Sequence, residues 1–180
     1  MPAPNPATGR PGHAYEAAQL RWATLADAPL LVELWRAAYP DDAAEDVATW
    51  LEHGGALTLQ DNAGRMLAAL RWREEGAGWR VDRVATRPDA RGQGYGRWLA
   101  TKVEALAIRR NVPFLLLSLP AADAGQLAYY ERMGYRVTDE PPLNGAHRGA
   151  QRTLRKVVGG VWQRKPTGTN GRSSGGSGRA

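Results

Sequence analysis

The chain has 180 residues and no cysteine, and its 24 Lys and Arg outnumber its 18 Asp and Glu. This length suits one domain that buries a core without metals, and the missing cysteine excludes disulfides, thiolate metal sites and a cysteine nucleophile. The first 20 residues show no apolar secretory signal, and the most apolar run, 112–119, is too short to span a bilayer. We therefore expect a soluble, cytoplasmic protein.

The basic excess belongs to the C-terminal part of the chain. Residues 141–180 hold eight Lys and Arg and no acidic residue, whereas residues 1–140 hold 16 basic and 18 acidic residues. A basic Gly/Ser-rich segment can attract nucleic acid without specificity, but its composition is also that of a solvated, disordered tail. The composition predicts a domain over 16–162 between disordered segments at 1–15 and 163–180.

Strand and helix patterns alternate from the start of the domain. Thr24, followed three residues later by Asp27, forms the hydroxyl–carboxylate pattern of a helix start, and Pro40 ends that helix. A second helix begins at Asp42 and is expected to end at Gly54-Gly55. In order, the sequence predicts a strand at 20–23, these two helices, and strands at 56–60, 66–74 and 79–86, the first two joined by a hairpin turn.

The second half of the domain begins with a long amphipathic helix that follows a glycine-rich segment. Residues 113–119 are nearly all apolar, which is typical of a central strand covered on both faces. A helix at 123–132 and strands at 135–138 and 151–158 complete the domain. The order β-α-α-β-β-β-α-β-α-β-β predicts an α/β fold, with helices on both faces of a mixed, mostly antiparallel sheet.

The glycine-rich segment lies between the strand at 79–86 and the long helix. Backbone N–H groups at a helix N-terminus have no intrahelical partner, and with the helix dipole they form an anion site. Glycines allow a diphosphate to approach the backbone closely. The spacing fits neither the dinucleotide fingerprint nor a Walker loop. The run therefore predicts a phosphate cradle of another kind: Arg91, Gly92, Gln93, Gly94, Tyr95 and Gly96.

Two segments carry a family resemblance. Residues 84–96, Val-Ala-Thr-Arg-Pro-Asp-Ala-Arg-Gly-Gln-Gly-Tyr-Gly, resemble the acetyl-CoA-binding segment of the GNAT acetyltransferases, whose pattern is Gln/Arg-x-x-Gly-x-Gly/Ala. Residues 128–135, Ala-Tyr-Tyr-Glu-Arg-Met-Gly-Tyr, resemble the Tyr-Glu-x-x-Gly-Phe/Tyr end of the family's next helix. The resemblance covers about residues 20–158. It implies direct transfer of acetyl from acetyl-CoA to a primary amine, with no metal and no covalent enzyme intermediate.

The resemblance also implies roles for individual residues. The glycine-rich run would bind the diphosphate, and the main chain of Val84, Ala85 and Thr86 would polarise the thioester and pair with the pantetheine arm. Tyr130 would protonate the departing thiolate, with Tyr129 as the alternative. Asp123 stands where the family often has an Asn that bonds the cofactor; it either does so here or caps the helix.

The general base and the acceptor site are less defined by the sequence. Asp82, on the strand that enters the site, can accept the proton of the amine through water, or it can be an ordinary solvent-facing residue. The resemblance places the acceptor between the first two helices and a late hairpin, where acidic residues could attract a cationic amine or favour a helix start. The other candidate bases are Glu33, Glu45 and His147, and the candidate acceptor-site residues are Trp35, Tyr39, Asp41, Asp42, Glu45, Asp46 and residues 141–147.

Two functions from other classes fit parts of the sequence. An acyl-CoA-binding domain that has lost transfer would act as a sensor or regulatory module. A protein that binds nucleic acid through its basic tail would show salt-dependent binding that deletion of 163–180 abolishes. No specific nucleic-acid partner is expected, because the domain shows no recognition helix or aromatic platform. The acceptor, the length of the acyl chain and a homodimeric state stay open.

Overall fold

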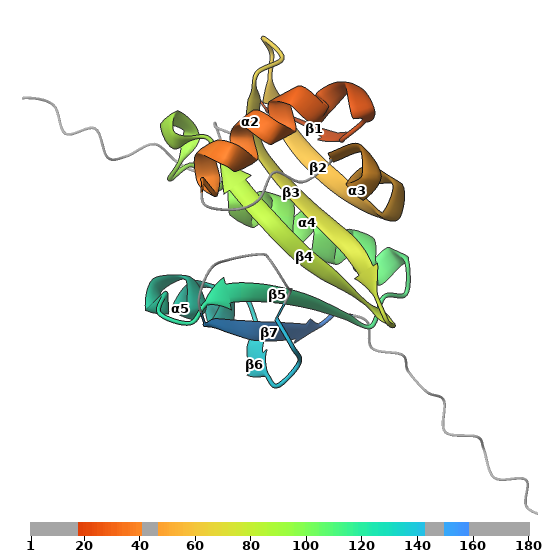
Figure 1. Ribbon diagram of the computed structural model, residues 1–180, viewed down its shortest axis with the longest axis vertical. Coiled ribbons are helices and arrows are strands. Elements are labelled where there is room, and N and C mark those ends of the chain that lie inside the picture. The colour runs from red at the N-terminus through yellow and green to blue at the C-terminus, as the bar shows by residue number, and fades with distance from the viewer. Residues whose placement is uncertain (1–17, 41–46, 143–149, 159–180) are drawn as a thin grey trace, which may run out of the picture.

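The computed structural model describes residues 18–40, 47–142 and 150–158, and they form one mixed sheet with helices on both of its faces (Figure 1). Seven strands lie in the order β1-β2-β3-β4-β5-β7-β6. All neighbouring strands are antiparallel except β4 and β5, which are parallel. The predicted fold class and element order are therefore confirmed.

The elements follow the predicted order closely. Along the chain they are β1 (Ala18–Trp22), the 3₁₀ turn η1 (Leu25–Asp27), α2 (Ala28–Ala38), α3 (Val47–His53), β2 (Gly54–Asp61), β3 (Met66–Glu75), β4 (Gly78–Thr86), the 3₁₀ turn η2 (Pro88–Ala90), α4 (Tyr95–Arg109), β5 (Phe114–Pro120), α5 (Ala124–Arg132), β6 (Arg136–Thr138) and β7 (Gln151–Val157).

The start of the first helix is built as its sequence pattern predicts. The Asp27 carboxylate accepts hydrogen bonds from the backbone N–H and the hydroxyl of Thr24, at 2.8 and 2.9 Å. These bonds close the turn η1, and α2 begins directly after it. The buried side chains of α2 then recur at helical spacing as Leu31, Leu34 and Trp35.

One predicted boundary is wrong in an informative way. Gly54 and Gly55 do not cap the second helix but open β2. A Cβ on Gly54 would lie 2.3 Å from the carbonyl oxygen of Trp72, and a Cβ on Gly55 would lie 2.3 Å from the ring of the same residue. The two glycines are therefore required by the close approach of β3, which local sequence does not reveal.

Two separate cores cover the two faces of the sheet. On one face, α4 packs Leu99, Val103 and Leu106 against the strands. On the other face, α2 and α3 pack Leu31, Trp35 and their neighbours against β3 and β4. Because β3 has helices on both faces, its residues from Met66 to Trp72 are all buried. This buried strand is paired with β4 and holds the side of β4 that faces away from β5.

Candidate active site

A cleft opens where the parallel strands β4 and β5 separate. They pair at Trp79–Leu115 and Arg80–Leu116, near their N-terminal ends, and diverge beyond this point (Figure 1). The cleft between them has a volume of about 250 Å³. Strands that part within a sheet present backbone N–H and C=O groups on both walls, which suits an extended ligand that pairs as a strand does. The polar lining includes Tyr39, Arg80, Asp82, Arg83, Ser118, Gln126 and Tyr130.

The glycine-rich run lies directly after β4, at the open end of this cleft. The strand ends at Thr86, the turn η2 follows, and α4 begins after its N-cap Gly94. Gly92 and Gly94 have φ angles of 76° and 81°, in the left-handed region that glycine adopts most readily. The space beside Gly92 is open, since a Cβ there would have nothing within 4 Å. The segment therefore leaves open space beside the backbone just before the N-terminus of α4, as a phosphate cradle needs; binding of phosphate there stays a prediction.

The residues of the predicted cradle differ in which of their groups could reach a ligand, the main chain or the side chain. The Tyr95 side chain is buried in the core, so only its main chain is available at the start of α4. Gln93 is exposed. The Arg91 Nε lies 3.4 Å from the carbonyl oxygen of Thr86, which keeps this guanidinium beside the end of β4. A Cβ on Gly96 would meet Thr86 and Val84 side-chain atoms at an ordinary 3.8 Å.

Tyr130 is the tyrosine of α5 that lines the cleft. Its ring packs edge-on against Tyr129 at 5.1 Å and against Tyr135 at 5.6 Å, measured between ring centroids. Burial, with smaller contributions from the nearby phenols of Tyr39 and Tyr129, raises the pKa of Tyr130 well above its usual value of 10. The phenol is therefore held in its protonated form, as a proton donor must be.

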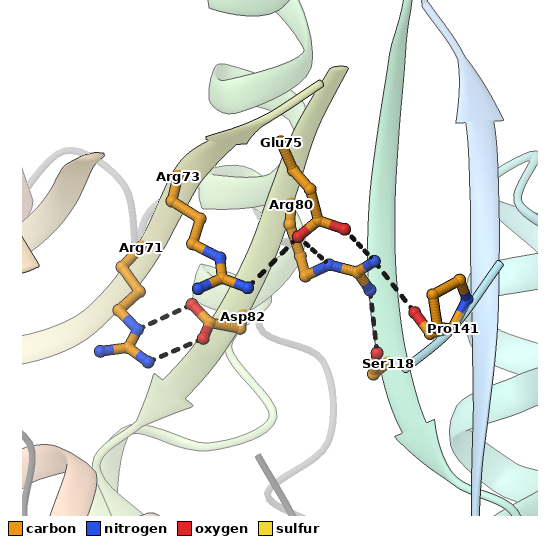
Figure 2. A network of polar contacts seen from close by, with 7 residues as sticks. All are labelled: Arg71, Arg73, Glu75, Arg80, Asp82, Ser118 and Pro141. Carbon is orange, nitrogen blue, oxygen red and sulfur yellow. Dashed lines mark hydrogen bonds and ion pairs between the residues drawn. The ribbon is translucent and has the colours of Figure 1, made fainter. Parts of the chain in front are cut away.

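Asp82 also lines the cleft, but it is not the solvent-facing residue that one interpretation of the sequence suggested. Its two carboxylate oxygens accept hydrogen bonds of 2.7 Å each from Nε and a terminal nitrogen of Arg71 (Figure 2). The Asp82 side chain is 12% exposed and that of Arg71 is 3% exposed. Each carboxylate oxygen keeps a second lone pair with which it can accept a proton or a hydrogen bond from the cleft.

Asp123 is the N-cap of α5. Its carboxylate accepts hydrogen bonds from the backbone N–H and the side-chain amide of Gln126, at 2.8 and 2.7 Å. The capping interpretation therefore describes the contacts that this carboxylate makes. Contact with the cofactor arm stays a prediction.

A buried arginine of β4 that the sequence did not single out is bonded to the end of β3, to β5 and to the segment after β6. Arg80 is 1% exposed and donates hydrogen bonds to both carboxylate oxygens of Glu75, to the hydroxyl of Ser118 at 3.2 Å and to the carbonyl of Pro141 at 3.1 Å (Figure 2). It thereby ties β4 to β5 at the point where the strands begin to separate. The sequence signal for this contact was the pair of opposite charges, Glu75 and Arg80, that flanks the turn at Gly76–Gly78. Such a pattern alone does not distinguish a buried ion pair from a surface ion pair.

The remaining predicted residues are distributed as follows. Tyr39 lines the cleft, whereas Trp35 is buried behind it and Glu33 lines a separate hollow between α2 and η2. Among the described residues, no helix is long and apolar enough to cross a membrane, and no three metal-binding side chains cluster. The segments 1–15 and 163–180, the acidic residues of 41–46, and residues 143–147 lie outside the part of the chain that the structure describes.

Comparison with known proteins agrees with the fold. The model of the acetyltransferase (GNAT) family matches residues 24–135, and the chain therefore belongs to this family. A search of curated proteins finds no match.

Solved structures share the fold at low sequence identity. The ribosomal-protein-S18-alanine N-acetyltransferase from Escherichia coli is 19% identical, with a TM-score of 0.65 over 82% of this chain and 97% of that one. A GNAT family acetyltransferase from Elizabethkingia anophelis, with acetyl-CoA bound, is 18% identical, with a TM-score of 0.65 over 79% of this chain and 99% of that one. The PaiA N-acetyltransferase from Thermoplasma acidophilum, in complex with coenzyme A, is 13% identical, with a TM-score of 0.60 over 78% of this chain and 99% of that one.

Proposed function

We propose that the protein is an N-acetyltransferase that transfers acetyl from acetyl-CoA directly to a primary amine of a small molecule or peptide. The observation that carries this proposal is the cleft between β4 and β5, which has the glycine-rich run at its open end and Tyr130 on its wall. An elongated thioester with a diphosphate at one end fits this arrangement, and two of the structurally similar proteins hold acetyl-CoA or coenzyme A.

The binding of acetyl-CoA would use mostly main-chain groups. Backbone N–H groups of residues 93–96, with Gly92 and the guanidinium of Arg91, would hold the diphosphate. The main chain of Val84, Ala85 and Thr86 would pair with the pantetheine arm and polarise the thioester carbonyl. This arrangement brings the reacting carbon next to the polar part of the cleft.

The transfer step would then use two side chains that line the cleft. The amine nitrogen bonds to the thioester carbon, the carbon–sulfur bond breaks, and the hydroxyl of Tyr130 gives its proton to the sulfur. The proton lost by the amine passes to Asp82, directly or through water. Because the acyl group moves straight to nitrogen, the lack of cysteine is no obstacle.

A thiol-release assay with acetyl-CoA across a library of amines and peptides tests this function. We expect release of free CoA that depends on an amine acceptor, with the acetylated product identified by mass spectrometry. The variant D82N should lower kcat by about a hundredfold or more at saturating acetyl-CoA, since general-base catalysis contributes about 10²–10⁴-fold. Tight binding of acetyl-CoA with no transfer to any acceptor would favour the sensor function instead.

A further inference from the structure

The strand β4 carries one residue more than β3 where it passes the cleft, because Arg83 and Val84 lie opposite a single residue of β3. Such a β-bulge interrupts the ladder of hydrogen bonds between the strands. Arg83 also has a φ of 49°, in the left-handed region that residues other than glycine adopt rarely. A conformation of this kind persists only where its surroundings hold it in place.

The helix α2 supplies two hydrogen bonds that hold the bulge. The indole N–H of Trp35 donates to the carbonyl oxygen of Arg83 at 3.1 Å, and the hydroxyl of Tyr39 donates to the carbonyl oxygen of Val84 at 2.8 Å. The two donors are four residues apart, so they project from one side of the helix end. Trp35 is 6% exposed, and its bond therefore meets little competition from water.

Each of these bonds also fixes an N–H group. A trans peptide is planar, so its C=O and N–H point in opposite directions. The bond from Trp35 to the carbonyl of Arg83 therefore sets the direction of the Val84 N–H. In the same way, the bond from Tyr39 to the carbonyl of Val84 holds the plane of the Val84–Ala85 peptide. Val84 lies on the wall of the cleft.

We propose that Trp35 and Tyr39 are positioning residues, which hold the bulge so that the Val84 N–H faces the thioester carbonyl of acetyl-CoA. This inference rests on the proposed function. Trp35 acts without touching the substrate, because it lies behind the bulge. An N–H held in advance stabilises the negative charge that develops on the carbonyl oxygen, and it does so without reorganisation during the reaction.

The test measures the infrared carbonyl band of bound acetyl-CoA labelled with ¹³C at the thioester carbon. A hydrogen bond to the carbonyl lowers the stretching frequency, so W35F and Y39F should each shift the band to higher frequency than in the wild-type protein. Loss of one hydrogen bond should also lower kcat by about five- to tenfold. The dissociation constant of acetyl-CoA should change by less than about twofold, since most of its contacts are elsewhere.

W50F is the matched control for W35F. The Trp50 and Trp35 rings pack edge to face, with 5.8 Å between their centroids. The guanidinium carbon of Arg71 lies 5.1 Å from the ring centroid of Trp50 and 5.4 Å from that of Trp35. The control therefore removes similar packing but not the bond to the bulge, and it should leave the band unchanged.

Three results would overturn the inference. The first is an unshifted band in both W35F and Y39F, where Y39F removes only a hydroxyl and preserves the fold. The second is an equal shift in W50F, which would trace the effect to packing. The third is failure of the wild-type protein to bind acetyl-CoA, which would contradict the proposed function as well. If the wild type transfers acetyl and the bands of both variants are unshifted, only this inference is contradicted.

Discussion

Arg71 and Asp82 lie directly opposite each other on β3 and β4 and are joined by two parallel hydrogen bonds of 2.7 Å. The Arg71 guanidinium also lies over the rings of Trp35 and Trp50. The negative charge on the wall of the cleft is thus balanced by a positive charge buried under α2 and α3. This pair joins the part of β4 that enters the cleft to the core that α2 and α3 form on the same face of the sheet.

The Arg71–Asp82 pair should show strong energetic coupling. D82N leaves the buried guanidinium without its counter-charge, so the free energy of unfolding should fall by about 2–3 kcal/mol. The double variant R71M/D82N should lose about 1–3 kcal/mol less than the sum of the two single variants. Urea denaturation of the four proteins measures this coupling. The exposed pair Arg87–Asp89 is the control, and a cycle on that pair that gave equal coupling would contradict this prediction.

Tyr130 should act as a proton donor throughout the pH range of the assay. Because burial raises the pKa of Tyr130 well above 10, the hydroxyl keeps its proton as the pH rises to about 10. Y130F should therefore lower kcat with little change in the affinity for acetyl-CoA, and the wild-type enzyme should not lose kcat through this group below that pH. The measurement is kcat against pH at saturating acetyl-CoA. A loss of kcat between about pH 7 and 9 that disappears in Y130F would contradict the assignment.

Local sequence patterns predicted the order of elements and the place of the glycine-rich run between β4 and α4. Some sequence patterns depend only on residues that are close together in the chain, so they can be interpreted without tertiary structure. They are the Thr24–Asp27 pattern, the long apolar run at 113–119 and the glycines after β4. The same holds for Tyr130, whose position follows from the register of one helix. This is why the family resemblance and the described fold agree.

Relationships between strands were not predictable in the same way. The pairing of Asp82 with Arg71 depends on the exact register of β3 and β4, and beyond this pair the bulge at Arg83 and Val84 shifts the register by one residue. Nothing in the sequence around Asp82 marks the bulge. The close approach of β3 likewise decides the place of Gly54, which local patterns assigned to a helix end.

Glu75 should make the stability of the protein sensitive to acid. Its hydrogen bonds and charge interaction with Arg80 outweigh the effect of burial and hold the pKa of Glu75 below its ordinary value of 4.5. The unfolded chain therefore binds this proton more readily than the folded protein does. The stabilisation is fully present above pH 4.5 and is lost as the pH falls through the lower folded-state pKa. Urea denaturation between neutral pH and about pH 3 measures the slope, which should be smaller in E75Q; an unchanged slope in that variant would rule out Glu75 as its source.

Gly92 and Gly64 allow a direct test of the predicted cradle, because the two have the same backbone φ at different places. Both have a φ of 76°, and a Cβ on either would have nothing within 4 Å. G92A and G64A should therefore each lower the free energy of unfolding by about 1 kcal/mol, from backbone strain alone. Only G92A should weaken the binding of acetyl-CoA, because its new methyl group lies where the diphosphate is expected and Gly64 lies in the β2–β3 hairpin turn. Isothermal titration with acetyl-CoA separates the two variants, and equal affinities would mean that the diphosphate does not approach the backbone at Gly92.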